Sequence, residues 1–304
     1  MAVAKYDGAI WDLSKVTSFE SLVHKSAIIT GSASGLGKAY AEAFVKAGSF
    51  VTVADYDEET GKQTAAQLGS NAQFVKCDVR SWDDQVAVFE AAVTNSPDKS
   101  CDIVISNAGI IVPDDMFKFD DPSQPPIKPD LRTLEVNLLG TAYTIKLAIH
   151  YFRRQSLDRT RDRCLILKSS LSGYVDQPGA PQYNASKWGV RGFLRSYRRD
   201  LHNENIRVNL VAPWYVRTPI LSDATVEFLQ SKGVNFATMD DAASTMLRIA
   251  AMKEVNGRSF GIVPKEMASL GCLDLEHDDY QEGDFMKGWQ DTVLETAQSV
   301  VDLA

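Results

Sequence analysis

Cysteine is scarce in this sequence, and its four cysteines are not placed for a thiolate site. Cys77, Cys101, Cys164 and Cys272 lie far apart, and no Cys-x-x-Cys spacing occurs. Zinc sites and disulfide scaffolds need closely spaced or paired cysteines, so both are disfavoured. The four histidines are equally scattered. We therefore expect no metal site and a reducing, cytoplasmic location.

Long apolar runs and a basic excess are also missing. No run approaches the roughly 18 residues that span a bilayer, and residues 1–13 lack the apolar core of a signal peptide. The net charge is −8, whereas a nucleic-acid partner requires basic surface. We expect no membrane and no nucleic acid as partners.

The acidic excess lies in the last 40 residues of the chain. Residues 265–304 carry ten acidic side chains and two lysines, and subtracting these from the totals of 40 and 32 leaves 30 of each sign in residues 1–264. We therefore predict a main domain at 23–264, preceded by an N-terminal arm at 1–22 and followed by an acidic C-terminal extension at 265–304. Apolar residues at helical spacing predict an amphipathic helix at 282–303, as a lid or a subunit contact.

Short apolar runs alternate with helical patterns throughout residues 23–264. The runs are four or five residues long, as expected for strands buried on both faces: 27–30, 50–54, 74–77, 103–106, 164–167, 208–211 and 260–263. The helical patterns cover 36–47, 58–68, 82–93, 131–154, 183–204 and 240–252. This alternation predicts one α/β domain of the Rossmann type. It would contain a doubly wound parallel sheet of about seven strands with helices on both faces, an N-terminal arm and an acidic, helical C-terminal tail.

A glycine-rich turn follows the first predicted strand, in the sequence Thr-Gly-Ser-Ala-Ser-Gly-Leu-Gly at 30–37. Gly31 would permit the tight turn, Gly35 would let the backbone approach a pyrophosphate, and Gly37 would let the next helix pack on the strand. The N-terminus of that helix offers free N–H groups to phosphates. An ordinary glycine-rich loop is the alternative, but the strand before it and the helix after it favour a dinucleotide site.

Asp55 ends the second predicted strand, 18 residues after Gly37. A carboxylate there can accept hydrogen bonds from both adenosine ribose hydroxyls, and it repels a 2′-phosphate. Neither Ser34 nor Tyr56 supplies the cation that an NADP site needs. The pattern favours NAD, although an ordinary strand-end turn would also explain Asp55.

Tyr183 and Lys187 form the one Tyr-x-x-x-Lys in the chain, and this spacing places both on one helix face. Such a pair alone arises by chance in many proteins. Other motifs stand before this pair in the chain: residues 30–37, Asp78, Asn107-Ala108-Gly109, Asn137, and Ser170 thirteen residues before Tyr183. Their order, with the pair, resembles the motif order of the short-chain dehydrogenase/reductase family. The chain resembles this family over about residues 23–264. Within it, the chain is similar to fungal NAD-dependent alcohol dehydrogenases of secondary metabolism and to hydroxyprostaglandin dehydrogenases.

The resemblance implies catalytic roles for four residues. Tyr183 would be the general base, Ser170 would hold the substrate oxygen, and Asn137 would anchor a water chain to Lys187. At about 4 Å and an effective dielectric near 20, the Lys187 charge would favour the Tyr183 phenolate by about 4 kcal/mol, or about three pKa units. The implied NAD-binding residues are Gly31, Ser34, Gly35, Leu36, Gly37, Asp55, Asp78, Val79, Asn107, Ala108, Gly109, Tyr183, Lys187, Pro213, Val216 and Thr218.

One position departs from the family pattern. Trp214 follows Pro213 where the family usually has glycine, so a large ring enters the nicotinamide region or forms a wall of the substrate pocket. Thr218 keeps the position whose hydroxyl normally holds the carboxamide.

The predicted substrate is a bulky, mostly apolar secondary alcohol, oxidised to a ketone. Its pocket would be lined by apolar residues, which would otherwise close a loop core: Ile110, Ile111, Met116, Phe117, Tyr174, Val175, Trp214, Tyr215, Ile220, Leu221 and Phe228. Ketone reduction, a cyclase or isomerase reaction, or a non-catalytic NAD-binding regulator are the alternatives. The resemblance also implies a homodimer or homotetramer, formed through the helices at 131–154 and 183–204.

Overall fold

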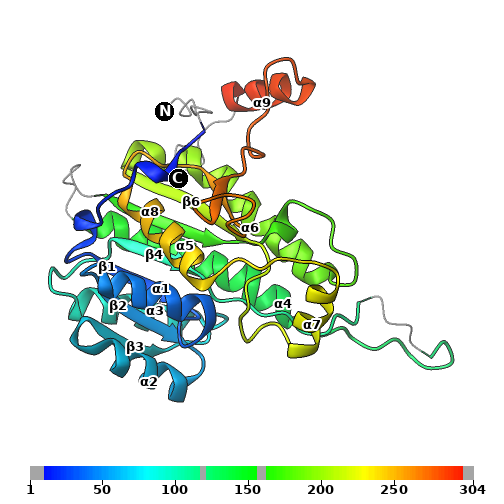
Figure 1. Cartoon of the computed structure of the whole chain (residues 1–304), viewed down its shortest axis with the longest axis horizontal. Coiled ribbons are helices and arrows are strands. Elements are labelled where there is room, and N and C mark those ends of the chain that lie inside the picture. Colours follow the sequence, from blue (N-terminus) through cyan, green and yellow to red (C-terminus); the bar gives the residue numbers. More distant parts are fainter. Residues whose placement is uncertain (1–9, 117–120, 156–161, 297–304) are drawn as a thin grey trace.

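Eight strands form one sheet in the order β3-β2-β1-β4-β5-β6-β7-β8. The computed structural model describes residues 10–116, 121–155 and 162–296 (Figure 1). The parallel strands are β1 (Ser26–Thr30), β2 (Phe50–Asp55), β3 (Ala72–Lys76), β4 (Ile103–Ser106), β5 (Arg163–Lys168), β6 (Ile206–Pro213) and β7 (Ser259–Ile262). The predicted doubly wound parallel sheet is confirmed.

The eighth strand, β8 (Cys272–Asp274), was not predicted. It pairs antiparallel with β7 and lies at the edge of the sheet. Its three residues are too few for a periodic pattern, and they lie in the segment predicted to form the acidic tail. The predicted domain boundaries at residues 22 and 264 stay a prediction.

Helices cover both faces of the sheet, as expected (Figure 1). Successive side chains of a strand point to opposite faces, so Ile29 and Ile28 of β1 belong to two separate buried clusters. One cluster packs under α1 (Gly35–Lys46), α2 (Glu58–Leu68) and α8 (Met239–Ala251). The other packs under α3 (Trp82–Asn95), α5 (Gly140–Arg154) and α6 (Pro181–Asp200).

The described part of the N-terminal arm docks on the domain. Trp11 and Phe19 pack against the first cluster, and Leu13 and Leu22 are buried within it. Arg248 of α8 donates to the carbonyl oxygens of Leu13 and Val16, at 2.8 Å each. These contacts hold the described residues of the arm on the domain, whereas residues 1–9 lie outside the described residues.

Two further helices lie outside the sheet layers. The helix α7 (Asp223–Ser231) was not predicted, whereas α9 (Phe285–Thr296) confirms the amphipathic helix expected in the tail. Residues 297–303 of that predicted helix lie outside the described residues. Figure 1 shows α9 apart from the sheet, and none of its residues is buried.

Parallel strands bring their carboxyl ends to one edge of the sheet, which is where ligands bind in open α/β folds. The segments that follow β1, β2, β4, β5 and β6 therefore meet at this edge, and they carry most of the predicted site residues. In the described parts of the chain, no helix combines the length and the apolar character needed to cross a bilayer.

Candidate active site

The glycine-rich turn between β1 and α1 has no room for side chains at two positions. A Cβ on Gly37 would lie 2.1 Å from the Gly31 carbonyl oxygen, and a Cβ on Gly31 would lie 2.7 Å from Ala108 Cα. Gly31 and Gly35 also have positive φ angles of +63° and +54°, which favour glycine. Ser34 precedes α1 without a side-chain cap, so the first N–H groups of the helix are left for an anion. The turn and the start of α1, residues 31–37, thus form a cradle that fits a dinucleotide pyrophosphate.

Asn107 holds the turn in place from the end of β4. Its Nδ2 donates to the carbonyl oxygens of Thr30 and Gly31, at 2.8 Å each. The Thr30 hydroxyl accepts from Ala108 N at 3.1 Å. Asn107 Oδ1 is buried without a hydrogen-bond partner among the described residues. The structure thus brings Asn107 and Ala108 to Gly31, and their predicted contact with the cofactor stays a prediction.

The carboxyl ends of β2 and β3 supply two acids with different partners. Asp55 accepts from Ala33 N at 2.8 Å and from Asp57 N at 3.0 Å, so it lies against the glycine-rich turn. Asp78 instead pairs with Arg80 at 2.6 Å, and hydrogen bonds from Arg80 hold the pKa of Asp78 below its usual value. The neighbouring Val79 is buried against α5, where a Cβ on Gly140 would lie 2.8 Å from Val79 Cγ2.

The segment after β6 reaches back to the glycine-rich turn. A Cβ on Gly35 would lie 3.7 Å from Thr218 Cβ, which puts Thr218 beside the turn. Val216 is buried and bridges to Ala237. The Trp214 indole donates to Asn235 O at 3.1 Å, so this ring is held by the segment that precedes α8.

The four predicted catalytic residues come together beside β5. Lys187 Nζ lies 5.3 Å from the centroid of the Tyr183 ring and donates to Lys168 O at 3.3 Å. Ser170 follows β5, and its Oγ accepts from Ser172 N at 3.2 Å. A Cβ on Gly109 would lie 3.5 Å from Lys187 Nζ and 3.3 Å from Asn137 Oδ1, so Gly109 leaves the space that both polar groups share.

Asn137 lies in a π-helical turn, Glu135–Leu139, between α4 (Arg132–Leu134) and α5. Such turns are frequent at functional sites. Its Oδ1 accepts from Ile110 N at 2.8 Å, and its Nδ2 donates to Ile110 O at 2.9 Å and to Ser186 Oγ at 3.3 Å. The carboxamide thus joins the segment after β4 to α6, and the role of Asn137 in a water chain to Lys187 stays a prediction.

Burial dominates the electrostatics of the Tyr183–Lys187 pair. It raises the pKa of Tyr183, although a hydrogen bond with Ser170 opposes the shift. Burial, together with the charge of Lys168, lowers the pKa of Lys187 to about 7. The pKa of Tyr183 is therefore shifted in the direction opposite to the prediction, because the loss of water around the phenol outweighs its hydrogen bond with Ser170.

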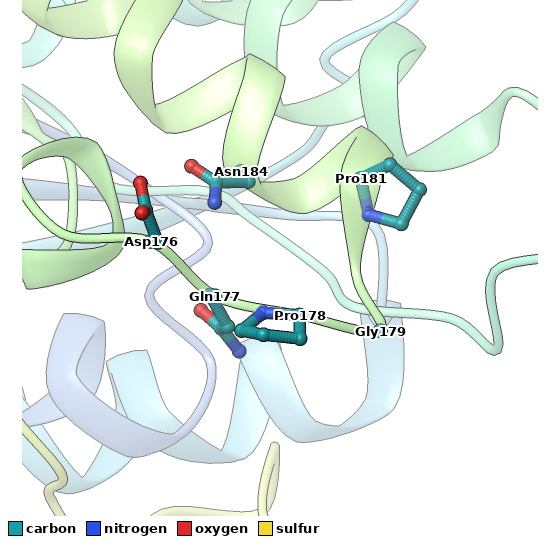
Figure 2. Close-up of a pocket in the computed structure, with 6 residues that line it drawn as sticks. All are labelled: Asp176, Gln177, Pro178, Gly179, Pro181 and Asn184. Atoms are coloured by element: carbon teal, nitrogen blue, oxygen red, sulfur yellow. The ribbon is translucent and has the colours of Figure 1, made fainter.

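A pocket opens beside this constellation, between the segment after β5 and the start of α6 (Figure 2). Its volume is about 510 Å³, and it is lined by Asp176, Gln177, Pro178, Gly179, Pro181 and Asn184. Figure 2 shows Asn184 extending from α6 toward Asp176 and Gln177. Asn184 Oδ1 is buried without a partner among the described residues. This lining does not include the apolar side chains predicted for the substrate pocket, of which Phe117 lies outside the described residues.

Two cations at the site were missed by sequence reasoning. Lys168 ends β5 beside Lys187, and burial lowers its pKa to about 8; a lysine that closes an otherwise apolar strand was the available signal. Arg80 lies after β3, where the sequence predicts the adenosine end of the cofactor, bound to Asp78 and 3.7 Å from Glu135. Its position depends on how β3 packs beside β2, which has no local sequence signal.

Comparison with known proteins decides the family. The family model described as short chain dehydrogenase matches residues 25–227. The chain belongs to this family. As a short-chain dehydrogenase it is an oxidoreductase, and the cradle at Gly31–Gly37 fits the family's nicotinamide dinucleotide.

Two fungal relatives are similar along most of their length. The chain is 38% identical to 5′-hydroxyaverantin dehydrogenase of Dothistroma septosporum, covering 85% of this chain and 89% of that protein. It is 33% identical to 5′-hydroxyaverantin dehydrogenase of Emericella nidulans, covering 86% and 90%. The predicted similarity to fungal secondary-metabolism dehydrogenases is confirmed.

A solved structure has the same fold. The 3-ketoacyl-(acyl-carrier-protein) reductase from Brucella melitensis, complexed with NADH, matches with a TM-score of 0.70 and 24% identity. The match covers 79% of this short-chain dehydrogenase and 97% of the reductase chain.

Replacing Gly37 by alanine should reduce NADH binding by at least about tenfold, because the new methyl group meets backbone and the cradle must open. NADH fluorescence titration measures the loss, and circular dichroism checks the fold. Gly192→Ala is the matched control: it also lies in a helix, where a Cβ meets nothing within 4 Å. Unchanged NADH binding by Gly37→Ala would contradict the cradle.

The buried Lys187 amine predicts a pH dependence of stability. The pKa of Lys187 is about 7 in the folded protein and about 10.4 in an unfolded chain. The unfolded chain therefore binds more protons between these values, and the free energy of unfolding rises with pH. Urea unfolding at several pH values between about 7 and 9 should show a rise that is smaller in Lys187→Met, by about 1 kcal/mol per pH unit. The exposed Lys146→Met should retain the wild-type slope, and equal slopes for all three proteins would refute the assignment.

Proposed function

We propose that the protein is an NAD-dependent alcohol dehydrogenase that oxidises a secondary alcohol of a bulky, mostly apolar substrate to a ketone. The observation that carries the proposal is the meeting of Ser170, Tyr183 and Lys187 beside a dinucleotide cradle. Asn137 supports this group by joining the segment after β4 to α6. A purely regulatory protein would have no need for these groups to meet, so we favour an enzyme.

Tyr183 would take the proton of the substrate hydroxyl, and Ser170 would hold the substrate oxygen by a hydrogen bond. Bound NAD⁺ would supply the hydride acceptor and a positive charge near the phenol. Burial raises the pKa of Tyr183, so the residue needs positive charge nearby to act as a base at neutral pH. Lys187 would supply part of that charge when it is protonated.

The choice of NAD over NADP rests on Asp55. Its carboxylate lies at the end of β2 against the turn, where it would bind ribose hydroxyls and repel a 2′-phosphate. Arg80, a cation at this end of the site, is bound to Asp78. A fungal relative from Phoma sp. with 32% identity is named as an NADP-dependent dehydrogenase, so the cofactor preference requires a direct test.

The proposed substrate class draws on the relatives and on exposed apolar side chains. Both fungal relatives are named for 5′-hydroxyaverantin, which makes this compound the first candidate. Several residues predicted to line the pocket are exposed although they are apolar, which suits an apolar ligand: Ile111, Met116, Val175, Ile220 and Phe228. The buried, unpartnered Asn184 Oδ1 could accept one hydrogen bond from a substrate hydroxyl.

We further propose a homodimer or homotetramer that forms through the helical segments 131–154 and 183–204. Leu139, Tyr143 and Trp188 belong to these segments and leave large apolar surfaces exposed. Apolar patches of this kind are typical of protein interfaces.

Turnover should depend on the Tyr183 hydroxyl. We expect the wild-type protein to form NADH with 5′-hydroxyaverantin or with a member of a series of bulky apolar secondary alcohols. Tyr183→Phe should lower kcat by about 100- to 10,000-fold, the usual contribution of a general base, while NADH still binds. Tyr197→Phe, on the same helix, is the control and should retain activity. If Tyr183→Phe turns over like the wild type, the proposed mechanism is wrong.

NADH should bind at least about tenfold more tightly than NADPH, because the 2′-phosphate would face a carboxylate. Asp55→Asn keeps the size of the side chain and removes its charge, so it should narrow this difference. Asp57→Asn is the matched control, since Asp57 caps α2 through Thr60 N. Side-by-side fluorescence titrations measure the six affinities of the three proteins for the two cofactors, and tighter binding of NADPH by the wild type would overturn the NAD assignment.

A further inference from the structure

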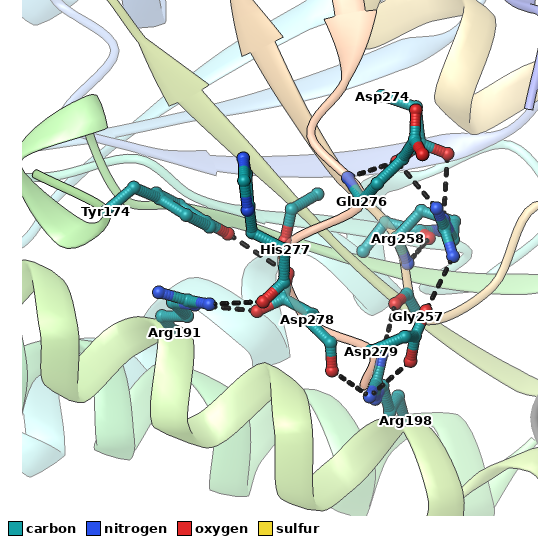
Figure 3. A network of polar contacts seen from close by, with 12 residues as sticks. Tyr174, Arg191, Arg198, Gly257, Arg258, Asp274, Glu276, His277, Asp278 and Asp279 are labelled. Atoms are coloured by element: carbon teal, nitrogen blue, oxygen red, sulfur yellow. Dashed lines mark hydrogen bonds and ion pairs between the residues drawn. The ribbon is translucent and has the colours of Figure 1, made fainter. Parts of the chain in front are cut away.

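A buried network of ion pairs joins the C-terminal segment to the helix that carries Tyr183 and Lys187. Figure 3 shows it between the end of β8, the start of β7 and α6. The acids all come from residues 274–279, and the cations come from the domain: Asp274, Asp278 and Asp279 meet Arg191, Arg198 and Arg258. Buried ion pairs contribute little net stability, so what this network positions is of more interest than its energy.

Asp278 is a buried acid that accepts hydrogen bonds from three side chains. Its side chain is 4% exposed. Its Oδ1 accepts from Arg191 Nε at 2.6 Å, and its Oδ2 accepts from the Tyr174 hydroxyl at 3.1 Å and from the Ser259 hydroxyl. Burial opposes ionisation, but hydrogen bonds from Ser259 and Arg191 hold the pKa of Asp278 below its usual value. A charged Asp278 therefore joins three parts of the fold: α6 through Arg191, the turn after β5 through Tyr174, and β7 through Ser259.

Two of these contacts lead directly to the turn that carries Ser170. Arg191 lies one helical turn after Lys187, and its guanidinium donates to Gly173 O at 3.2 Å and lies 4.1 Å from the centroid of the Tyr174 ring. Gly173 N donates in turn to Ser170 O at 2.9 Å.

The turn packs closely against α6 at Gly173, where no side chain would fit. A Cβ at this position would lie 2.7 Å from Ser169 Oγ and 2.9 Å from Lys187 O. The turn thus packs on α6 at Gly173, and Asp278 holds it through Arg191 and Tyr174.

Asp279 is the neighbouring acid, and its contacts lead elsewhere. It pairs at 3.0 Å with Arg198, which lies about two helical turns after Arg191, and at 2.8 Å with Arg258, which precedes β7. The two acids therefore share a segment, a charge and a buried network, but Asp278 alone of the two contacts Tyr174 and Arg191 in the described residues.

We propose that Asp278 is a positioning residue that fixes Ser170 relative to Tyr183, so that the C-terminal segment completes the active site. The catalytic consequence rests on the proposed dehydrogenase function. The structural part does not, because it concerns the order of residues 170–174.

The test compares Asp278→Asn with Asp279→Asn in the full-length protein. Each substitution keeps the side-chain size and removes one charge from the network; Asp278 is buried, whereas the Asp279 side chain is 23% exposed. Hydrogen exchange, read by mass spectrometry on peptides that cover residues 170–175, reports the Gly173 and Tyr174 amides without any substrate. We expect exchange there to accelerate by about tenfold or more in Asp278→Asn and to stay at the wild-type rate in Asp279→Asn. Equal exchange in both variants would overturn the positioning role.

Kinetics supply the second readout. In Asp278→Asn, kcat should fall by about 10- to 100-fold, the usual effect of a misplaced catalytic group, with NADH affinity and substrate KM little changed. Asp279→Asn should lower the melting temperature similarly but keep its kcat. If both variants lose stability alike and neither loses kcat, the network is structural only and the proposal fails.

A milder variant covers the case in which Asp278→Asn does not fold. Tyr174→Phe removes one hydroxyl and leaves the ring under Arg191, so it should accelerate exchange in residues 170–175 with a smaller loss of kcat. Unchanged hydrogen exchange in Tyr174→Phe, together with an Asp278→Asn variant that does not fold, would also refute the positioning role of Asp278. If the wild type shows no NAD-dependent turnover, the proposed function fails, while the exchange results still decide whether Asp278 orders the turn.

Discussion

The amine of Lys187 is buried between α6 and β5, and much of the site depends on that burial. A charged amine out of water is unfavourable unless its neighbours compensate it, and burial lowers its pKa accordingly. Lys187 Nζ is held by Lys168 O, and the missing side chain of Gly109 leaves the space beside it. Asn137 reaches the same space from the π-helical turn. The end of β5, the segment after β4 and the π-helical turn thus pack around the amine of Lys187.

Acidic side chains that are concentrated near the C-terminus in the sequence form ion pairs with arginines from earlier parts of the chain. The acidic excess of the protein lies in residues 265–304, yet three of those acids meet arginines of α6 and of the start of β7 inside the fold. The strand β8 brings them there by pairing with β7. It is itself the edge strand of the sheet, and its three residues leave few unpaired backbone groups for other chains. The C-terminal segment therefore has two parts: residues up to 279 belong to the packed domain, and the described residues of α9 contribute nothing buried.

The elements predicted best were those with a local signal. The strands β1 to β7 are short apolar runs, and the turn at Gly31–Gly37 and the Tyr183–Lys187 spacing are each read within eight residues. The π-helical turn at Asn137 and the helix α7 have weaker periodic patterns, and both were missed. Asp278 and Arg191 are 87 positions apart, so no local pattern connects them. The direction of the Tyr183 pKa shift was predicted wrongly because spacing reports a neighbouring charge but not the loss of water around it.

The sequence by itself determined the sheet type, the dinucleotide turn and the pair Tyr183 and Lys187, because strand and helix periodicity and glycine placement are properties of neighbouring residues. Tertiary structure alone decided which groups share a dry environment. It placed Lys168 beside Lys187, bound the Asn137 carboxamide to Ile110, and brought Asp278 to the turn of Ser170. Burial and long-range pairing depend on every element that packs at a point, and that information is distributed over the whole chain.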